Sequence, residues 1–283
     1  MNYVNEYCHF NDANKTLYFN NGLTVITEKM VPKSIRPDIE NVVIPNTVQK
    51  IDNQVFAEYI SLKTIDIPDS VHEIGESVFF NCVSLEKVSI GSGVKTIGDI
   101  SFLRCPEIKR VEITDLSAWI NIDFKTSFSI PLSQQADLYL DGKKITNLKI
   151  PKDVGFVLPY AFIRCKSIES VSVPGNISYI DHNAFAQCRN LKKVNIENGV
   201  KAIYDFVFES CTSLDMIKLP SSINQIGQAA FDCQSDNLKI SCPATNFFKR
   251  WGKENDFDIY TSELGKFINS ITPDTTEIFM DNE

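Results

Sequence analysis

The sequence has few of the residues and patterns from which enzyme active sites are usually built. It contains three histidines, two tryptophans and four methionines in 283 residues. His9, His72 and His182 lie far apart, and the metalloprotease, nucleophile-elbow and phosphate-loop motifs are all missing. Catalysis requires convergent groups of the right type. We therefore expect a protein without enzymatic activity, catalytic residues, metal site or cofactor; an enzyme site assembled across distant segments is the weaker alternative.

Long apolar runs and excess positive charge are lacking too. No apolar stretch approaches the length that crosses a bilayer, and the first ten residues lack the basic segment and apolar core of a secretory signal. The formal net charge of −8 argues against nucleic acid or an anionic membrane as the main partner. The favoured location is cytoplasmic, and the cell surface or secretion is the alternative.

Cysteine is present, but not in the close pairs that zinc sites use. Eight cysteines occur, and five of them recur at one position of a repeat: Cys82, Cys105, Cys165, Cys188 and Cys211. We interpret this column as buried thiols that act as small hydrophobic side chains. Unpaired thiols fit a reducing compartment. A metal ladder or cross-coil disulfides are the alternatives.

A repeat of 23 residues organises the rest of the chain. Each repeat contains a phenylalanine at the same position, and one repeat is longer than the others by about 14 residues. Self-similarity at a period of this length is typical of solenoids. The phenylalanines are Phe56, Phe79, Phe102, Phe162, Phe185, Phe208 and Phe231.

The period of apolar residues changes within one repeat and so predicts its elements. Leu85–Ile90 alternates at its end, which is typical of a short strand with one buried face. Val71–Ile74 predicts a second short strand, and Gly75 is expected to turn the chain with a positive φ. Glu76–Cys82 predicts about two helical turns that carry the phenylalanine inward.

The pattern I-P-x-S-V-x-x-I-G-x-x-A-F-x-x-C-x-S-L-x-x-V resembles the BspA-like subgroup of leucine-rich repeats. It is matched by Ile67–Val88, Val173–Val194 and Leu219–Phe231, and the resemblance covers roughly residues 41–260. It implies an α/β, β-rich repeat fold: a right-handed, curved, parallel solenoid of about seven 23-residue coils. Caps at both ends and one lengthened central coil complete this expectation. Members of the subgroup serve mainly as interaction surfaces, so the resemblance implies a protein-protein interaction module.

The flanking segments depart from the repeat. Residues 1–40 are predicted to form a cap and linker, with a hairpin at Leu17–Ile26 around Asn21 and Gly22. Residues 241–260 are predicted to close the solenoid with a helix at Asn246–Glu254, capped by Thr245, and a strand at Phe257–Tyr260. Residues 261–283 form the tail, whose apolar positions predict an amphipathic helix: Leu264, Phe267, Ile268 and Ile271.

The lengthened repeat contains an insert at residues 114–149. Asp115 is placed to cap a helix that carries Trp119, and Leu138–Ile145 predicts a hairpin around Asp141 and Gly142. Insertions in solenoids often form exposed binding loops. Trp119 and Tyr139 are therefore candidate contact residues, although packing beneath the insert is the favoured alternative.

The main candidate binding surface is the outward side of the strands, on the inner curve. Variation down such columns is expected of a repeat array used in recognition. Several cations there predict a locally basic face for another protein, with an acidic surface, or for a glycan. A cell-surface adhesin that binds a host protein or glycan is the alternative function. The candidate partner-binding residues, besides Trp119 and Tyr139, are Lys87, Ser89, Arg110, Glu112, Lys149, Ser170, Ser172, Lys193, Asn195, Met216 and Lys218.

Overall fold

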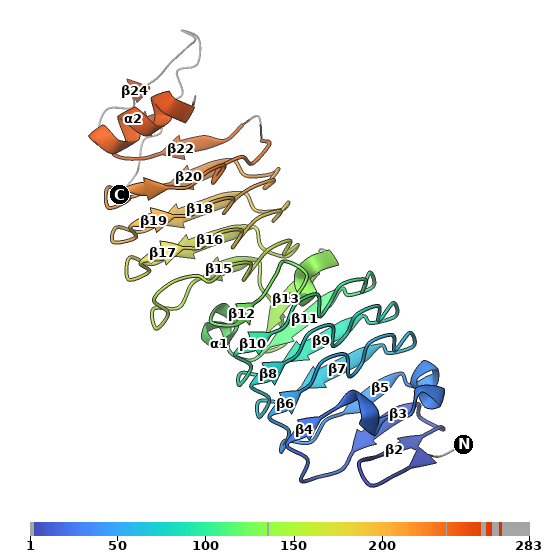
Figure 1. The fold of residues 1–283 in the computed structure, drawn as a ribbon. Helices are drawn as coiled ribbons and strands as arrows, with labels where there is room; N and C mark the ends of the chain where they lie inside the picture. Colours follow the sequence, from blue (N-terminus) through green and yellow to red (C-terminus); the bar gives the residue numbers. More distant parts are fainter. Residues whose placement is uncertain (1–2, 135, 236, 256–258, 262–265, 268–283) are drawn as a thin grey trace. The chain divides into compact units, whose positions relative to one another are not determined.

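The computed structural model describes residues 3–134, 136–235, 237–255, 259–261 and 266–267. They form two units built from stacked coils of parallel β-structure (Figure 1). Unit 1 contains the residues up to Ile145 together with Leu158–Ser167, and unit 2 contains Thr146–Val157 and the residues from Ile168 onward.

Unit 1 contains a nine-stranded sheet of order β1-β2-β3-β5-β7-β9-β11-β13-β14 and a five-stranded sheet of order β12-β10-β8-β6-β4. Its elements are β1 (Tyr3–Val4), β2 (Cys8–Asn11), β3 (Thr16–Phe19), β4 (Val25–Ile26), the 3-10 helices η1 (Glu28–Met30) and η2 (Lys33–Asp38), β5 (Asn41–Val43), β6 (Lys50–Ile51), β7 (Thr64–Ile67), β8 (Glu73–Ile74), β9 (Lys87–Ile90), β10 (Thr96–Ile97), β11 (Arg110–Ile113), α1 (Leu116–Ile120), β12 (Asp123–Phe124), η3 (Pro131–Gln134), β13 (Asp137–Leu140) and β14 (Lys143–Lys144).

Unit 2 contains a seven-stranded sheet of order β15-β16-β18-β20-β22-β23-β24 and a three-stranded sheet of order β17-β19-β21. Its elements are β15 (Asn147–Lys149), β16 (Ser170–Val173), β17 (Tyr179–Ile180), β18 (Lys193–Ile196), β19 (Ala202–Ile203), β20 (Met216–Lys218), β21 (Gln225–Ile226), β22 (Lys239–Ser241), α2 (Asn246–Asn255), β23 (Ile259–Thr261) and β24 (Lys266–Phe267).

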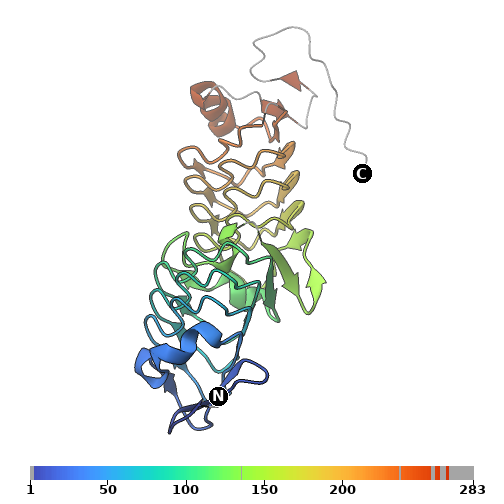
Figure 2. The ribbon, with the colours of Figure 1, turned by 90° about the vertical axis from the view of Figure 1, so that its right-hand side faces the viewer.

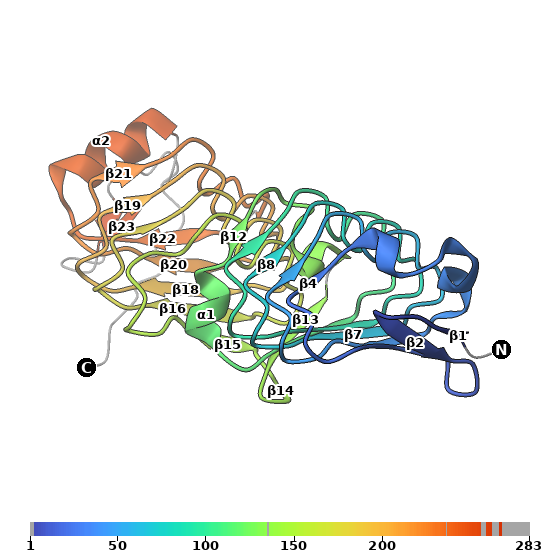
Figure 3. The same cartoon turned by 60° about the horizontal axis from the view of Figure 1, so that its bottom comes forward.

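Each regular coil contributes one strand to the larger sheet of its unit and one to the smaller sheet, on the opposite side of the coil (Figure 3). In β9, Val88 and Ile90 are buried while Lys87 and Ser89 face outward. This confirms the predicted alternation. The ladders continue beyond the seven predicted coils, because β3, β22 and β23 also pair in parallel with their neighbours.

The phenylalanine column forms the core of each unit. In unit 1 the rings of Phe56 and Phe79 stack with their centroids 5.5 Å apart, and those of Phe79 and Phe102 stack at 5.0 Å. In unit 2 Phe185 and Phe208 stack at 5.6 Å. All five side chains are fully buried, so each coil buries its ring against its neighbours.

The predicted helical turns at Glu76–Cys82 are wrong. The segment is a third ladder, in which the N–H groups of Ser77, Phe79 and Asn81 donate to carbonyl groups of the next coil. Ser77 and Asn81 have φ values of 55° and 60°, in the left-handed region. These two residues point alternate N–H groups along the stack, so inter-coil bonds replace the i to i−4 bonds of a helix.

Gly75, Gly98 and Gly227 do not have the predicted positive φ, which falls two residues later on a different residue type. Glycine is required at these positions by a close approach between coils. A Cβ on Gly98 would lie 2.5 Å from the carbonyl carbon of Gly75 and 2.6 Å from the backbone nitrogen of Glu76. The backbone of the preceding coil leaves no room for a side chain.

The N-terminal hairpin predicted around Asn21 and Gly22 is also wrong. β3 pairs antiparallel with β2 and parallel with β5, whereas β4 joins the smaller sheet beside β6. Residues 16–26 therefore already supply both strands of a coil, and the hairpin is formed by β2 and β3.

The predicted elements of the C-terminal segment are largely confirmed. Figure 2 shows α2 as the orange-red helix near the C-terminal end of unit 2. The N–H of Phe248 donates to Thr245 Oγ1 at the start of this helix, and the Trp251 ring packs edge-on against that of Phe231 with centroids 5.6 Å apart. β23 adds a parallel strand beside β22. Most of the tail lies outside the described residues, including Leu264, Ile268, Ile271 and the last nine residues. At Phe267 the chain forms strand β24 rather than the predicted helix.

Candidate partner-binding surface

We call the outward side chains of β7, β9, β11 and β13 the strand face of unit 1. Lys87 and Arg110 are neighbours in one column, and Ser89 and Glu112 are neighbours in the next, as predicted. Equivalent strands pair without an offset, so outward residues that are 23 positions apart in the sequence lie side by side.

The insert alters this face, because β13 lies directly beside β11. Asp137 therefore neighbours Arg110, and Tyr139 neighbours Glu112. If the columns ran unbroken across the insert, Asn147 would lie beside Arg110 and Lys149 beside Glu112. The sequence predicts this order, and the prediction is wrong, because β13 takes these positions and β15 pairs with β16. The predicted hairpin is confirmed: β14 pairs antiparallel with β13 (Figure 3), and Lys144 Nζ lies 2.7 Å from Asp137 Oδ2.

The cations of the strand face of unit 1 are neutralised within the protein. Arg110 lies 2.7 Å from Glu112, and its guanidinium group lies 3.6 Å from the centroid of the Tyr139 ring. Lys87 lies 3.7 Å from Asp66. The prediction of a basic face is therefore wrong for unit 1, where these charges already have partners.

Trp119 does not belong to the binding surface. It is 1% exposed, and its Nε1–H donates to the carbonyl of Ala161 at 2.9 Å. Asp115 caps the short helix by accepting from the N–H of Ala118, as predicted. The alternative interpretation is therefore confirmed for Trp119, which packs beneath the insert.

The outward side chains of β15, β16, β18, β20 and β22 form the strand face of unit 2. Its members are mainly lysine, serine and asparagine, and neither column contains a carboxylate. One column runs Asn147, Ser170, Lys193, Met216 and Lys239, and the other runs Lys149, Ser172, Asn195, Lys218 and Ser241.

Three lysines of this face have exposed side chains. Lys149, Lys193 and Lys218 are exposed and form no ion pair with any residue that the structure describes. The nearby Glu169 lies outside the columns and pairs with Lys192 at 2.9 Å. The predicted basic face is thus present on unit 2.

Lys239 and Ser241 were missed by the sequence analysis, which ended the repeat at Ile240. β22 nevertheless pairs in register with β20, with Ile240 beside Ile217. The sequence does indicate this further strand, because Ile217 and Ile240 are separated by one repeat length of 23 residues.

A depression of about 390 Å³ lies at the end of this face, where β18, β20 and β22 turn. Asn195, Lys218 and Ser241 line it, and their side chains make no hydrogen bond with the described part of the chain. Ser221 and Glu197 also line it; the first donates to Asn198, and the second accepts from the N–H of Gly175.

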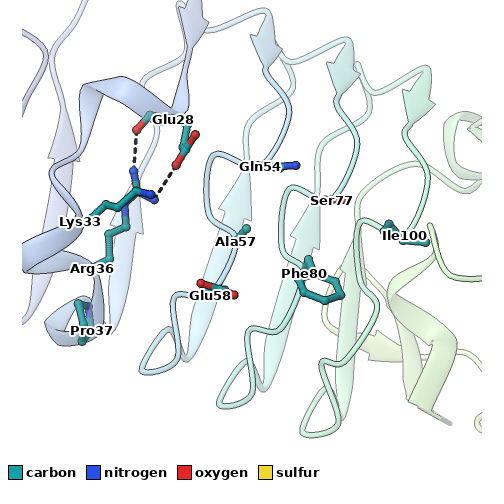
Figure 4. Close-up of a pocket in the computed structure, with 10 residues that line it drawn as sticks. All are labelled: Glu28, Lys33, Arg36, Pro37, Gln54, Ala57, Glu58, Ser77, Phe80 and Ile100. Atoms are coloured by element: carbon teal, nitrogen blue, oxygen red, sulfur yellow. Dashed lines mark hydrogen bonds and ion pairs between the residues drawn. The ribbon is translucent and has the colours of Figure 1, made fainter.

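A second depression, of about 470 Å³, lies in unit 1 between the 3-10 helices and the third ladder (Figure 4). Arg36 dominates one wall. It contacts the Glu28 carboxylate at 3.0 Å and donates to the carbonyls of Glu28 and Val31. Its guanidinium group already has protein acceptors, so we assign Arg36 to anchoring the N-terminal segment.

The histidines do not converge on a site. His9 and His72 are exposed, and His182 pairs with the adjacent Asp181 at 2.8 Å. Within the described ranges, no group of three or more histidine, cysteine, aspartate or glutamate residues is arranged to hold a metal ion. The same ranges contain no helix that is long and apolar enough to cross a membrane.

All eight cysteines are buried and none forms a disulfide bond, as predicted for the five of the repeat column. The thiols also bond between coils: Cys82 Sγ donates to the carbonyl of Phe56 at 3.1 Å, and Cys211 Sγ donates to that of Phe185 at 3.2 Å. Burial raises the pKa of Cys211 to about 12. The Cys211 thiol is therefore protonated and unreactive at neutral pH.

Comparison with known proteins identifies the repeat. The model of the BspA type leucine-rich repeat region matches residues 35–129 and 136–250 in six copies, which is well over half of the chain. No curated protein matches the sequence.

Solved bacterial structures share the repeat architecture at low identity. The pneumococcal vaccine antigen PcpA is 17% identical, with a TM-score of 0.46, over 72% of this chain and 56% of that one. The T. pallidum leucine-rich repeat protein is 17% identical, with a TM-score of 0.39, over 89% and 94% of the two chains. A leucine-rich repeat protein from Eubacterium ventriosum is 16% identical, with a TM-score of 0.37, over 85% and 84%. These similarities carry no functional argument.

Proposed function

We propose that this chain, which belongs to the BspA-type leucine-rich repeat family, is a non-enzymatic module that binds a partner protein through the strand face of unit 2. The family is one of interaction modules. The observation that supports this surface is the contrast between the two strand faces. Lys87 and Arg110 are paired with carboxylates on unit 1, whereas Lys149, Lys193 and Lys218 on unit 2 are exposed and form no ion pair with the residues that the structure describes. Exposed cationic side chains that have no ion pair to break lose less free energy when they bind a partner.

Blocking this face with bulky side chains should abolish partner capture. Ser172 and Asn195 are outward neighbours on β16 and β18, so Ser172→Trp with Asn195→Trp covers the centre of the face without adding charge. The matched control is Ser178→Trp with Gln225→Trp, two neutral residues at exposed positions associated with the smaller sheet of unit 2. Affinity capture from the native source, quantified by mass spectrometry, should lose a specific protein with the first variant alone. Equal capture by both variants would place binding elsewhere.

We further propose that the protein works in a reducing compartment, since eight buried cysteines without a disulfide bond are typical of one. The alternative adhesin would use the same face at the cell surface. Protein from the native source should show no thiol that reacts rapidly with a maleimide before unfolding. After unfolding without reductant, all eight should react. Recovery of disulfide-linked cysteines instead would favour export.

A further inference from the structure

We infer that the strand face of unit 2 binds an acidic polypeptide segment, whose carboxylates pair with Lys149, Lys193 and Lys218. The inference rests on the proposed function and adds the chemistry of the partner.

The first argument is charge. The protein carries a formal net charge of −8, yet the two columns from β15 to β22 contain lysines and no carboxylate. Each of the three lysines is exposed and lacks an ion pair among the described residues. A cationic surface attracts negatively charged groups, so this face favours encounter with an acidic partner.

The second argument is spacing. Neighbouring strands lie about 4.8 Å apart, so Lys149 and Lys218, three strands apart in one column, are separated by about 14 Å. Lys193 lies in the other column and is a diagonal neighbour of Lys218, about 8 Å away. An extended peptide places side chains on one face about every 7 Å. Acidic residues two to four positions apart therefore reach successive lysines.

The third argument is what lies between the lysines. Ser172 and Asn195 carry a hydroxyl and an amide group that both donate and accept hydrogen bonds. The hydroxyl of Ser170 donates to Asn147 Oδ1 and can still accept a hydrogen bond. They match the alternating N–H and C=O groups of a peptide backbone, whereas phosphate and sulfate groups can only accept. Three lysines also provide little neutralisation for a polyanion such as nucleic acid. The face is therefore suited to a polypeptide of moderate negative charge.

The depression beside Lys218 gives the segment an anchor. Lys218, Asn195 and Ser241 supply three side-chain donors around one end of the face. Glu197 contributes a carboxylate to the rim, but one of its oxygens accepts from Gly175. A single carboxylate of the ligand is expected to enter here, and the remaining carboxylates to pair with Lys193 and Lys149.

The test measures binding of the full chain to a fluorescein-labelled peptide of alternating glutamate and serine, by fluorescence anisotropy. A peptide with glutamine in place of glutamate reports the contribution of the carboxylates. The Lys149→Gln, Lys193→Gln, Lys218→Gln variant should bind the acidic peptide about tenfold more weakly or worse, at roughly one exposed ion pair per lysine. The matched control, Lys152→Gln, Lys201→Gln, Lys249→Gln, changes the same charge elsewhere on unit 2 and should bind like the wild type.

Three results would overturn the inference: equal binding of the two peptides, equal loss in both triple variants, or displacement of the peptide by a heparin oligosaccharide that binds more tightly. The last result would assign the face to a sulfated glycan.

Failure of this inference is separable from failure of the proposed function. If the Ser172→Trp, Asn195→Trp variant loses its captured protein while the acidic peptide does not bind, the strand face of unit 2 is the binding surface but its ligand is not an acidic segment. If neither experiment identifies the face, the proposed function itself fails.

Discussion

Replacing Phe185 with alanine is expected to lower the free energy of unfolding by about 3–5 kcal/mol. The side chain is fully buried and stacks on Phe208 with an interplanar angle of 10°. Its carbonyl also accepts from the thiol of Cys211 in the next coil. A cavity at this point therefore removes apolar contacts inside one coil and weakens the interface between two. Because the stability of a repeat array depends on such interfaces, unfolding should also become less cooperative.

Urea denaturation followed by circular dichroism measures this loss. Lys193→Glu is the matched control in the strand that follows, at an exposed position, and should change the free energy of unfolding by less than about 0.5 kcal/mol. A change below about 1 kcal/mol for Phe185→Ala would mean that the ring does not support the core. Unfolding caused by Lys193→Glu would mean that the inward and outward assignments are reversed.

The elements that could be predicted from the sequence are those fixed by repetition. Side chains that recur every 23 residues must lie in columns, so the strand register and the phenylalanine core followed directly from counting. The conformation between the strands did not. Ser77 and Asn81 adopt left-handed φ values because inter-coil hydrogen bonds replace helical ones, and such bonds depend on the neighbouring coil rather than on local propensity. The segment at Glu76–Cys82 therefore resembles a helix only when it is considered alone.

The sequence also predicted only part of the candidate surface: the positions of its residues but not their contacts. The outward positions of Lys87 and Arg110 followed from alternation, but their ion pairs with carboxylates did not. Whether a lysine or arginine is available depends on what its neighbours contribute. Glu112 lies on the same strand as Arg110, but the Tyr139 ring contacts Arg110 only because the insert adds β13 beside β11. Insert length alone does not show that this strand joins the sheet. The pairing of charges on unit 1 therefore required the structure.

Gly98→Ala is expected to destabilise the protein by about 3 kcal/mol. The added Cβ would lie 2.5–2.6 Å from backbone atoms of Gly75 and Glu76, closer than real Cβ contacts allow. Neither atom belongs to a flexible side chain, so relief requires the two coils to separate. Separation would lengthen the hydrogen bond from the N–H of Gly98 to the carbonyl of Ile74, which is 2.8 Å. Replacing a glycine lowers the conformational entropy of the unfolded chain, which stabilises the folded state by at most about 1 kcal/mol and does not offset this loss.

Gly155→Ala provides the control that separates the two effects. Its added Cβ would meet nothing within 4 Å, and its φ lies outside the left-handed region. This variant should be unchanged or more stable by up to about 1 kcal/mol. The comparison uses the midpoint and slope of urea denaturation for both variants. If Gly98→Ala instead matches Gly155→Ala, the coils are further apart than the structure has them, and the glycine column would have to be explained by turn formation. A selective loss for Gly98→Ala would show that the close approach of backbones, rather than a positive φ, requires glycine in this repeat.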